Sequence, residues 1–288
     1  MKKYFSLVLF AHSVFALPFA LIGFFLGVIT TDAPFQWYLL VLVLLCMVFA
    51  RNAAMAFNRY LDRHIDAKNP RTNMRDIPSG KVSANQALIF VVLNCLLFII
   101  TTAFINTLCL YLSPIALFVV LFYSYTKRFT ALCHMVLGLG LSLAPIGAYI
   151  AVTGYFNIVP VLYSFAVLFW VSGFDIIYAL QDEDFDREEK LHSIPATLGI
   201  SNALKLSVVL HVFSALCVII PVFLISFTWV YYIGIAFFCF ALIYQHLLVK
   251  PNDITKVNKA FATTNGYASV IFALCFLVDA FIRTNFYI

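Results

Sequence analysis

Residues 36–66 read QWYLLVLVLLCMVFARNAAMAFNRYLDRHID, an apolar run that ends in a cluster of polar and charged residues. The apolar part, about 36–60, is long enough for a helix that crosses a bilayer, which needs ~20 residues. Its apolar residues are continuous rather than alternating, which argues against a membrane strand. Asn58, Asp62 and Asp66 are spaced four apart, so a helix would place them on one face. The stretch predicts a membrane-spanning helix that presents carboxylates at one end.

The remainder of the chain is also strongly apolar. Of its 288 residues, 64% are hydrophobic and 11% are charged, whereas a soluble domain carries roughly 25% charged residues. Further apolar stretches lie at about 8–30, 84–105, 107–125, 133–153, 158–180, 202–226, 228–249 and 261–282. The first of them is too long for a secretory signal and lacks a clear cleavage site, so we expect it to be a helix as well. We predict an all-α, polytopic membrane protein: a bundle of nine transmembrane helices in a single membrane-embedded domain, residues 1–288.

The basic residues fall in alternate connections between these stretches. The connections near 31–35, 106, 154–157 and 227 contain no lysine or arginine. The positive-inside rule then predicts a cytoplasmic N-terminus, cytoplasmic basic loops and an outside C-terminus, in a bacterial inner membrane. Arg283, close to the C-terminus, is the one exception. The net charge of +5 thus reflects topology and anionic lipid rather than nucleic acid.

A second acidic cluster follows the stretch 158–180. Tyr178, Asp182, Asp186 and Lys190 repeat every four residues, and the predicted topology puts them on the same membrane side as Asn58. Carboxylate and amide oxygens suit Mg²⁺, which usually takes one or two protein carboxylates together with phosphate oxygens. A solvated helix end is the simpler interpretation of either cluster alone. Two clusters on one side, each in register, favour a magnesium-bridged diphosphate site.

Basic residues next to the clusters could bind the phosphates. Arg71 and Arg75 follow the first cluster, and Lys127 ends another apolar stretch; guanidinium groups suit phosphate particularly well. The positive-inside bias explains basic residues without any ligand, and we assign Arg128 to it.

Two charged residues lie within apolar stretches. Arg51 precedes Asn58 by seven residues and Asp175 precedes Asp182 by seven, so each would share a helical face with its cluster. An ionisable residue inside a membrane helix indicates a functional site. For Asp175, a structural partner on another helix is an equally good interpretation. The cysteines and histidines show no metal-ligand spacing, and we interpret them as structural.

Several motifs together resemble the UbiA superfamily of membrane prenyltransferases, in its 4-hydroxybenzoate polyprenyltransferase branch. They cover most of the chain and comprise Asn58 to Asp62 with Asp66, the loop 69–80, the segments 123–130 and 144–148, and Tyr178 to Asp186 with Ser193. Gln181 stands where some branches have a lysine.

The resemblance implies a central cavity open toward lipid, Mg²⁺, a polyprenyl diphosphate donor and an aromatic acid as acceptor. Asn58, Asp62, Asp66, Asp182 and Asp186 would bind magnesium and diphosphate. Arg71, Arg75, Lys127 and Tyr178 would contact the diphosphate. Arg51 would lie deeper, near the acceptor carboxylate, and Asp175 is a candidate base for the ring proton. Two alternatives stay open: a carboxylated dihydroxynaphthalene as acceptor in menaquinone biosynthesis, or a transporter.

Overall fold

The computed structural model describes residues 15–31 and 35–284, and it contains no β-strand within those ranges. The α-helices of this part are α2 (Leu17–Thr31), α3 (Trp37–Lys68), α4 (Ala84–Ala103), α5 (Thr107–Thr126), α6 (Cys133–Thr153), α7 (Ile158–Ala179), α8 (Glu183–Glu188), α9 (Ile194–Ile219), α10 (Trp229–Leu248) and α11 (Asn265–Thr284). Short 3₁₀ turns follow α7 and α9, and a π-helical turn, Lys259–Thr264, leads into α11.

Nine of these helices account for the predicted membrane spans, except that residues 8–14 of the first span lie outside the described residues. Eight segments between Trp37 and Arg283 are long and apolar enough to cross a membrane, and α2 is a shorter apolar helix. For the described residues, the prediction of an all-α bundle of nine membrane helices is therefore confirmed. The protein is an integral membrane protein.

Polar side chains begin the helices at the membrane boundaries. Ser83 and Gln86 form a reciprocal capping box at the start of α4, and Asn106 caps α5 through the Cys109 amide. Asn157 and Ser193 do the same for α7 and α9. Each cap satisfies a backbone donor that the first helical turn leaves without a partner.

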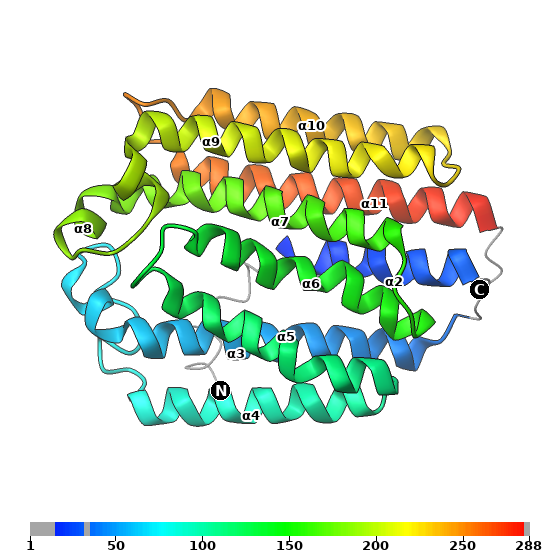
Figure 1. The fold of residues 1–288 in the computed structure, drawn as a ribbon, viewed down its shortest axis with the longest axis horizontal. Coiled ribbons are helices and arrows are strands. Elements are labelled where there is room, and N and C mark those ends of the chain that lie inside the picture. Colours follow the sequence, from blue (N-terminus) through cyan, green and yellow to red (C-terminus); the bar gives the residue numbers. More distant parts are fainter. Residues whose placement is uncertain (1–14, 32–34, 285–288) are drawn as a thin grey trace.

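Helix α3 is longer than the membrane requires. Its 32 residues span ~48 Å at the rise of an α-helix, whereas the hydrocarbon core is ~30 Å thick. The last turns, which carry Asn58, Asp62 and Asp66, therefore lie beyond the middle of the membrane, toward one surface. Figure 1 shows the long helices side by side, with the loop after α3 and helix α8 at the same end of the bundle. We call this end, where α3, α5 and α7 finish, the motif end.

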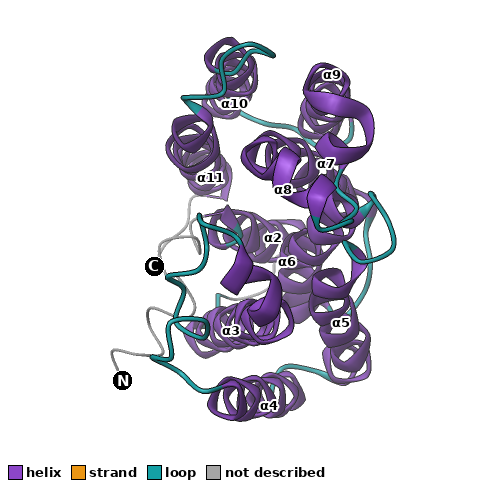
Figure 2. Ribbon diagram, turned by 90° about the vertical axis from the view of Figure 1, so that its left-hand side faces the viewer, coloured by secondary structure: helices purple, strands orange, loops and turns teal. Residues whose placement is uncertain are grey.

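Aromatic residues dominate the packing between α2, α7, α10 and α11. The buried rings of Phe19, Trp170, Phe238 and Phe272 contact one another. Viewed end-on in Figure 2, α3, α4 and α5 lie on the opposite side of α2 and α6 from α9 and α10. The two acidic motifs thus belong to helices from different parts of the bundle that meet at the motif end.

Arg283, the exception to the predicted charge distribution, is paired. Its Nε lies 2.8 Å from the fully buried carboxylate of Asp279, and its Nη1 donates to the Ser226 carbonyl at 2.7 Å. Asp279 also accepts from the Thr228 amide at 2.5 Å. The positive charge at this end is therefore compensated within the protein.

Candidate functional site

The first acidic motif is buried at the end of α3. Asp62 and Asp66 are only 2% and 3% exposed, and Asn58 Nδ2 donates to Asp62 Oδ2 at 3.1 Å. The three side chains share one helical face, as their spacing predicts. Buried carboxylates are stable only when cations or hydrogen-bond donors compensate their charge.

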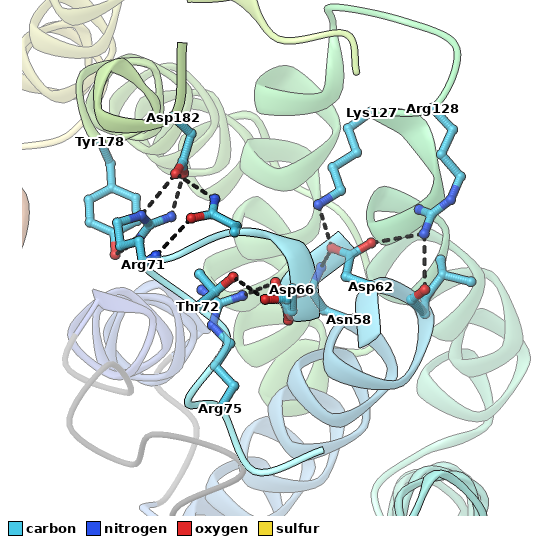
Figure 3. A network of polar contacts seen from close by, with 12 residues as sticks. Asn58, Asp62, Asp66, Arg71, Thr72, Arg75, Lys127, Arg128, Tyr178 and Asp182 are labelled. Carbon is cyan, nitrogen blue, oxygen red and sulfur yellow. Dashed lines mark hydrogen bonds and ion pairs between the residues drawn. The ribbon is translucent and has the colours of Figure 1, made fainter. Parts of the chain in front are cut away.

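Basic residues compensate each of these carboxylates (Figure 3). Lys127 Nζ lies 2.6 Å from Asp62 Oδ2, and Arg128 Nη2 lies 2.9 Å from Asp62 Oδ1. Arg75 Nη1 lies 2.7 Å from Asp66 Oδ1. The positive-inside bias does not by itself explain Arg128, because Arg128 belongs to this cluster. Its guanidinium also donates to the Leu61 carbonyl at 3.0 Å, which ties the end of α5 to α3.

The second motif does not form the regular helix that its four-residue spacing predicts. Helix α7 ends at Ala179, Leu180–Asp182 forms a 3₁₀ turn, and α8 begins at Glu183. Tightening into a 3₁₀ turn is common where a helix ends. Asp182 occupies the N-cap position of α8 without a side-chain capping hydrogen bond, and its carboxylate accepts from the loop after α3 instead. Asp182 and Asp186 therefore project from two short elements rather than from one helical face.

The loop after α3 connects the two motifs. Arg71 donates from Nε to Asp182 Oδ1 at 2.9 Å and from Nη2 to Asp182 Oδ2, and its Nη1 donates to the Tyr178 hydroxyl at 2.9 Å. Asn69 Nδ2 adds a third donor to Asp182 at 3.1 Å. Burial lowers the pKa of Arg71, but the hydrogen bonds and charge of Asp182 outweigh that effect and raise it overall. Asp186 lies beyond the 3₁₀ turn, on α8.

Arg51 lines a cavity of about 360 Å³ between α3, α5 and α6. Its Nε atom is buried and has no hydrogen-bond partner, and Tyr123 lies in the same wall. A buried guanidinium nitrogen without a partner is costly, and an anionic ligand in the cavity would compensate it. Arg51 is therefore the charged group through which the cavity could recognise a carboxylate.

Asp175 forms a hydrogen-bonded pair with His134. His134 Nδ1 lies 2.7 Å from Asp175 Oδ2, and the Ile194 amide donates to His134 Nε2 at 3.3 Å. Because Nε2 accepts that hydrogen bond, the proton is on Nδ1 and is donated to Asp175. The spacing of the histidines in the sequence gave no sign of this pair, which joins α6 to α7.

The donor set fits a magnesium ion that is shared with a phosphate ligand. Within the described ranges, no three His, Cys, Asp or Glu side chains converge as a protein-only metal cage. One buried oxygen, Asp66 Oδ2, nevertheless has no hydrogen-bond partner. Mg²⁺ commonly binds through one or two carboxylates, with phosphate oxygens and water completing its shell. Asn58, Asp62, Asp66, Asp182 and Asp186 supply only oxygen ligands of this kind.

Known proteins resemble this chain over most of its length. Residues 16–274 match the model of the UbiA prenyltransferase family. A protein of Aliivibrio fischeri (strain MJ11) named 4-hydroxybenzoate octaprenyltransferase is 32% identical over 255 residues, which covers 85% of each chain. A protein of the same name from Tolumonas auensis is 31% identical over 235 residues, covering 81% of this chain and 82% of the relative.

Solved structures share the fold. A UbiA homologue from Aeropyrum pernix K1 superposes with a TM-score of 0.84 at 31% identity, covering 93% of this chain and 98% of the other. A UbiA homologue from Archaeoglobus fulgidus bound to DMAPP and Mg²⁺ gives a TM-score of 0.69 at 22% identity, covering 94% and 99%.

Proposed function

Because this chain belongs to the UbiA prenyltransferase family, we propose that it transfers a polyprenyl group from polyprenyl diphosphate to an aromatic acid of the 4-hydroxybenzoate type, in quinone biosynthesis. One observation carries the proposal: a cluster of buried carboxylates and cations lies at the motif end, and an apolar cavity containing Arg51 lies beside α3. The cluster suits the diphosphate and its metal, and the cavity suits the organic parts of the two substrates. The names of the relatives support the same acceptor.

We propose that Asn58, Asp62, Asp66, Asp182 and Asp186 hold Mg²⁺ together with the donor diphosphate. When bound, the ion would neutralise charge that develops on the departing diphosphate. The A. fulgidus homologue solved with DMAPP and Mg²⁺ shares this fold, which supports the binding of a prenyl diphosphate together with magnesium.

The basic residues would bind the diphosphate directly. Arg71, Arg75 and Lys127 pair with the motif carboxylates in the structure. We add Arg128 because it follows Lys127 in the sequence and also contacts Asp62. A metal ion at the carboxylates would replace these cations and leave them to bind the phosphate oxygens. Cations arranged in advance around a leaving group stabilise the charge that forms in the transition state.

The reaction then follows from the separation of polar and apolar surfaces. The allylic C–O bond of the donor breaks, and its electron pair leaves with the diphosphate. An electron-rich ring carbon beside the phenol oxygen attacks the allylic cation, and loss of the ring proton restores aromaticity. The apolar walls would keep water from the cation. We propose Asp175 as the proton acceptor, oriented by the hydrogen bond from His134.

Arg51 would orient the acceptor through its carboxylate. The planar guanidinium can form paired hydrogen bonds with a carboxylate, and its buried Nε lacks a partner in the protein. A carboxylated dihydroxynaphthalene could use the same contact. We further propose that the whole chain forms one membrane domain, with the motif end facing the cytoplasm of a bacterial cell and the C-terminus outside.

Purified protein with Mg²⁺ and geranyl diphosphate tests this proposal when three acceptors are compared: 4-hydroxybenzoate, a carboxylated dihydroxynaphthalene and a phenol without a carboxyl group. We expect prenylated 4-hydroxybenzoate as the main product and little turnover of the phenol. Preferential turnover of the naphthalene acid would mean that the natural acceptor is the menaquinone precursor rather than 4-hydroxybenzoate. Equal turnover of the phenol would contradict recognition through Arg51.

A further inference from the structure

The cavity beside α3 is almost entirely apolar away from Arg51 and Tyr123. Thr102 and Ser113 also line it, but their hydroxyls donate to carbonyls of their own helices. Thr102 donates to Ile99 at 2.7 Å and Ser113 donates to Leu110 at 2.8 Å. These hydroxyls are therefore satisfied without a ligand, and the wall matches a hydrocarbon better than a polar group.

Two glycines of α6 face this cavity without a packing requirement. Gly140 and Gly147 both line it and, seven residues apart, lie on one helical face. A Cβ atom at Gly147 would meet nothing within 4 Å, and one at Gly140 would meet only Val120, at 3.7 Å or more. By contrast, a Cβ at Gly138 would come within 2.5 Å of both Ser172 Oγ and the Leu168 carbonyl oxygen. Helix packing thus explains Gly138 but not the other two.

Glycine at these positions has a cost. Inside a helix, glycine is less favourable than alanine. Since neither Gly140 nor Gly147 permits a close helix contact, the volume that they leave open is best explained by a ligand that occupies it.

The two glycines lie at different depths. Helix α5 finishes at the motif end, where Lys127 reaches Asp62, and α6 starts at Cys133 soon afterwards. Gly140 is therefore closer to the carboxylates, and Gly147 is ~10 Å farther along the helix. Phe156, which follows the far end of α6, lies farther along still. Ile115 lies ~16 Å from the end of α5 and therefore at a depth between the two glycines. Both residues line the cavity, and Ile115 and Phe156 are 60% and 57% exposed. The cavity thus reaches the outer, apolar surface of the bundle.

We propose that Gly140 and Gly147 determine which donor tails the enzyme accepts. The isoprenoid chain passes Gly140 first and Gly147 next, and a longer chain leaves the bundle beside Phe156. This inference rests on the proposed function, because it assigns the cavity to the tail of the donor whose diphosphate lies at the motif end.

Phenylalanine substitutions at the two positions test the order of these contacts. Detergent-solubilised protein is heated with Mg²⁺ and inorganic diphosphate, dimethylallyl diphosphate, geranyl diphosphate or octaprenyl diphosphate. A ligand that binds the folded state raises the unfolding temperature according to its affinity, so the increment over inorganic diphosphate reports binding of the tail. Leu139→Phe is the matched control, because Leu139 is on the same helix, 40% exposed and outside the cavity lining.

We expect Gly140→Phe to remove the increment for geranyl diphosphate. Gly147→Phe should reduce the increment for octaprenyl diphosphate more than that for geranyl diphosphate. In transfer assays, kcat/KM for the excluded donor should fall by roughly tenfold or more relative to dimethylallyl diphosphate, because the phenyl ring fills space that the longer tail needs. Unchanged increments in both variants, or equal losses for every donor, would overturn the assignment.

The binding measurement needs no acceptor, so it separates the two proposals. Suppose that the unfolding-temperature increments depend on the tail and change with the substitutions, but that no aromatic acid is prenylated. That result would support the tail cavity and contradict the proposed function. Transfer by the wild-type protein with donor preference unaltered in both variants would contradict only the tail cavity.

Discussion

Arg71 and Asp182 are 111 residues apart in the sequence, and two hydrogen bonds join them, from Nε to Oδ1 at 2.9 Å and from Nη2 to Oδ2. The pair closes the loop after α3 over the second motif, and the Tyr178 hydroxyl holds the third arm of the guanidinium. Arg71, which is suited to binding phosphate, thus forms an ion pair with Asp182, which is suited to binding a metal ion. We infer that magnesium and diphosphate bind together. Magnesium at Asp182 would free Arg71 to bind the diphosphate, and diphosphate at Arg71 would free Asp182 to bind magnesium.

Arg71→Lys should weaken donor binding although the charge remains. Lysine cannot reproduce two parallel hydrogen bonds and a third to Tyr178. We expect kcat/KM for the donor to fall by roughly tenfold or more, since hydrogen bonds to charged groups contribute ~1.5–3 kcal/mol. Steady-state kinetics with varied donor measure this. Lys68→Ala is the control, because its pair with Glu189 is exposed and such surface pairs contribute little; similar losses in both variants would refute the role of Arg71.

Asp62→Asn should nearly abolish turnover while the protein still folds. Asparagine keeps the shape of the side chain but removes the charge that pairs with Lys127 and Arg128. We expect transfer to fall by roughly a hundredfold or more, by analogy with other losses of electrostatic stabilisation. Product formation is measured on protein with a normal size-exclusion profile. Glu183→Gln, which weakens the i,i+4 pair with Arg187 but leaves the ion pairs of Asp62 in place, should retain activity. Wild-type turnover in Asp62→Asn would remove Asp62 from the metal site.

Arg51→Lys should affect the acceptor more than the donor. The substitution retains a positive charge in the cavity but loses the planar fork that would bind a carboxylate. We expect the acceptor KM to rise, or kcat to fall, by roughly tenfold, with a smaller change in the donor KM. Kinetics with each substrate varied separately distinguish these effects. If both constants stay at their wild-type values, Arg51 has a structural role only.

Asp175→Asn tests the proposed base. A neutral amide cannot accept the ring proton, and general bases typically contribute ~10²–10⁴-fold to a rate. We expect kcat to fall by roughly a hundredfold, and a primary kinetic isotope effect to appear with ring-deuterated acceptor because proton loss becomes rate-limiting. A slower variant without an isotope effect would indicate that the pair with His134 only positions α6 against α7.

Local features of the site could be predicted from the sequence, but contacts between distant segments could not. The register of Asn58, Asp62 and Asp66 follows from helical periodicity, because α3 continues unbroken to Lys68. The same periodicity fails for Asp182 and Asp186, because α7 ends at Ala179, Asp182 is the last residue of a 3₁₀ turn, and Asp186 belongs to α8. The regular spacing gave no signal of that break.

Ion pairs between residues that are distant in the sequence could be identified only from the fold. Arg128 looks like any basic loop residue until the end of α5 comes beside Asp62. His134 and Asp175 belong to different helices, and no spacing relates them. The charge of Arg283, which contradicted the topology rule, is compensated by Asp279 one helical turn earlier. An i,i+4 pair of this kind could have been recognised from the sequence.

Prenyl transfer as a function of Mg²⁺ tests the central claim most directly. The purified protein is stripped with a chelator, mixed with geranyl diphosphate and 4-hydroxybenzoate, and titrated with Mg²⁺ while prenylated product is measured by mass spectrometry. The account predicts no product without the ion and full recovery when it is added back. Continued transfer after exhaustive chelation would contradict a donor held through magnesium by the two acidic motifs.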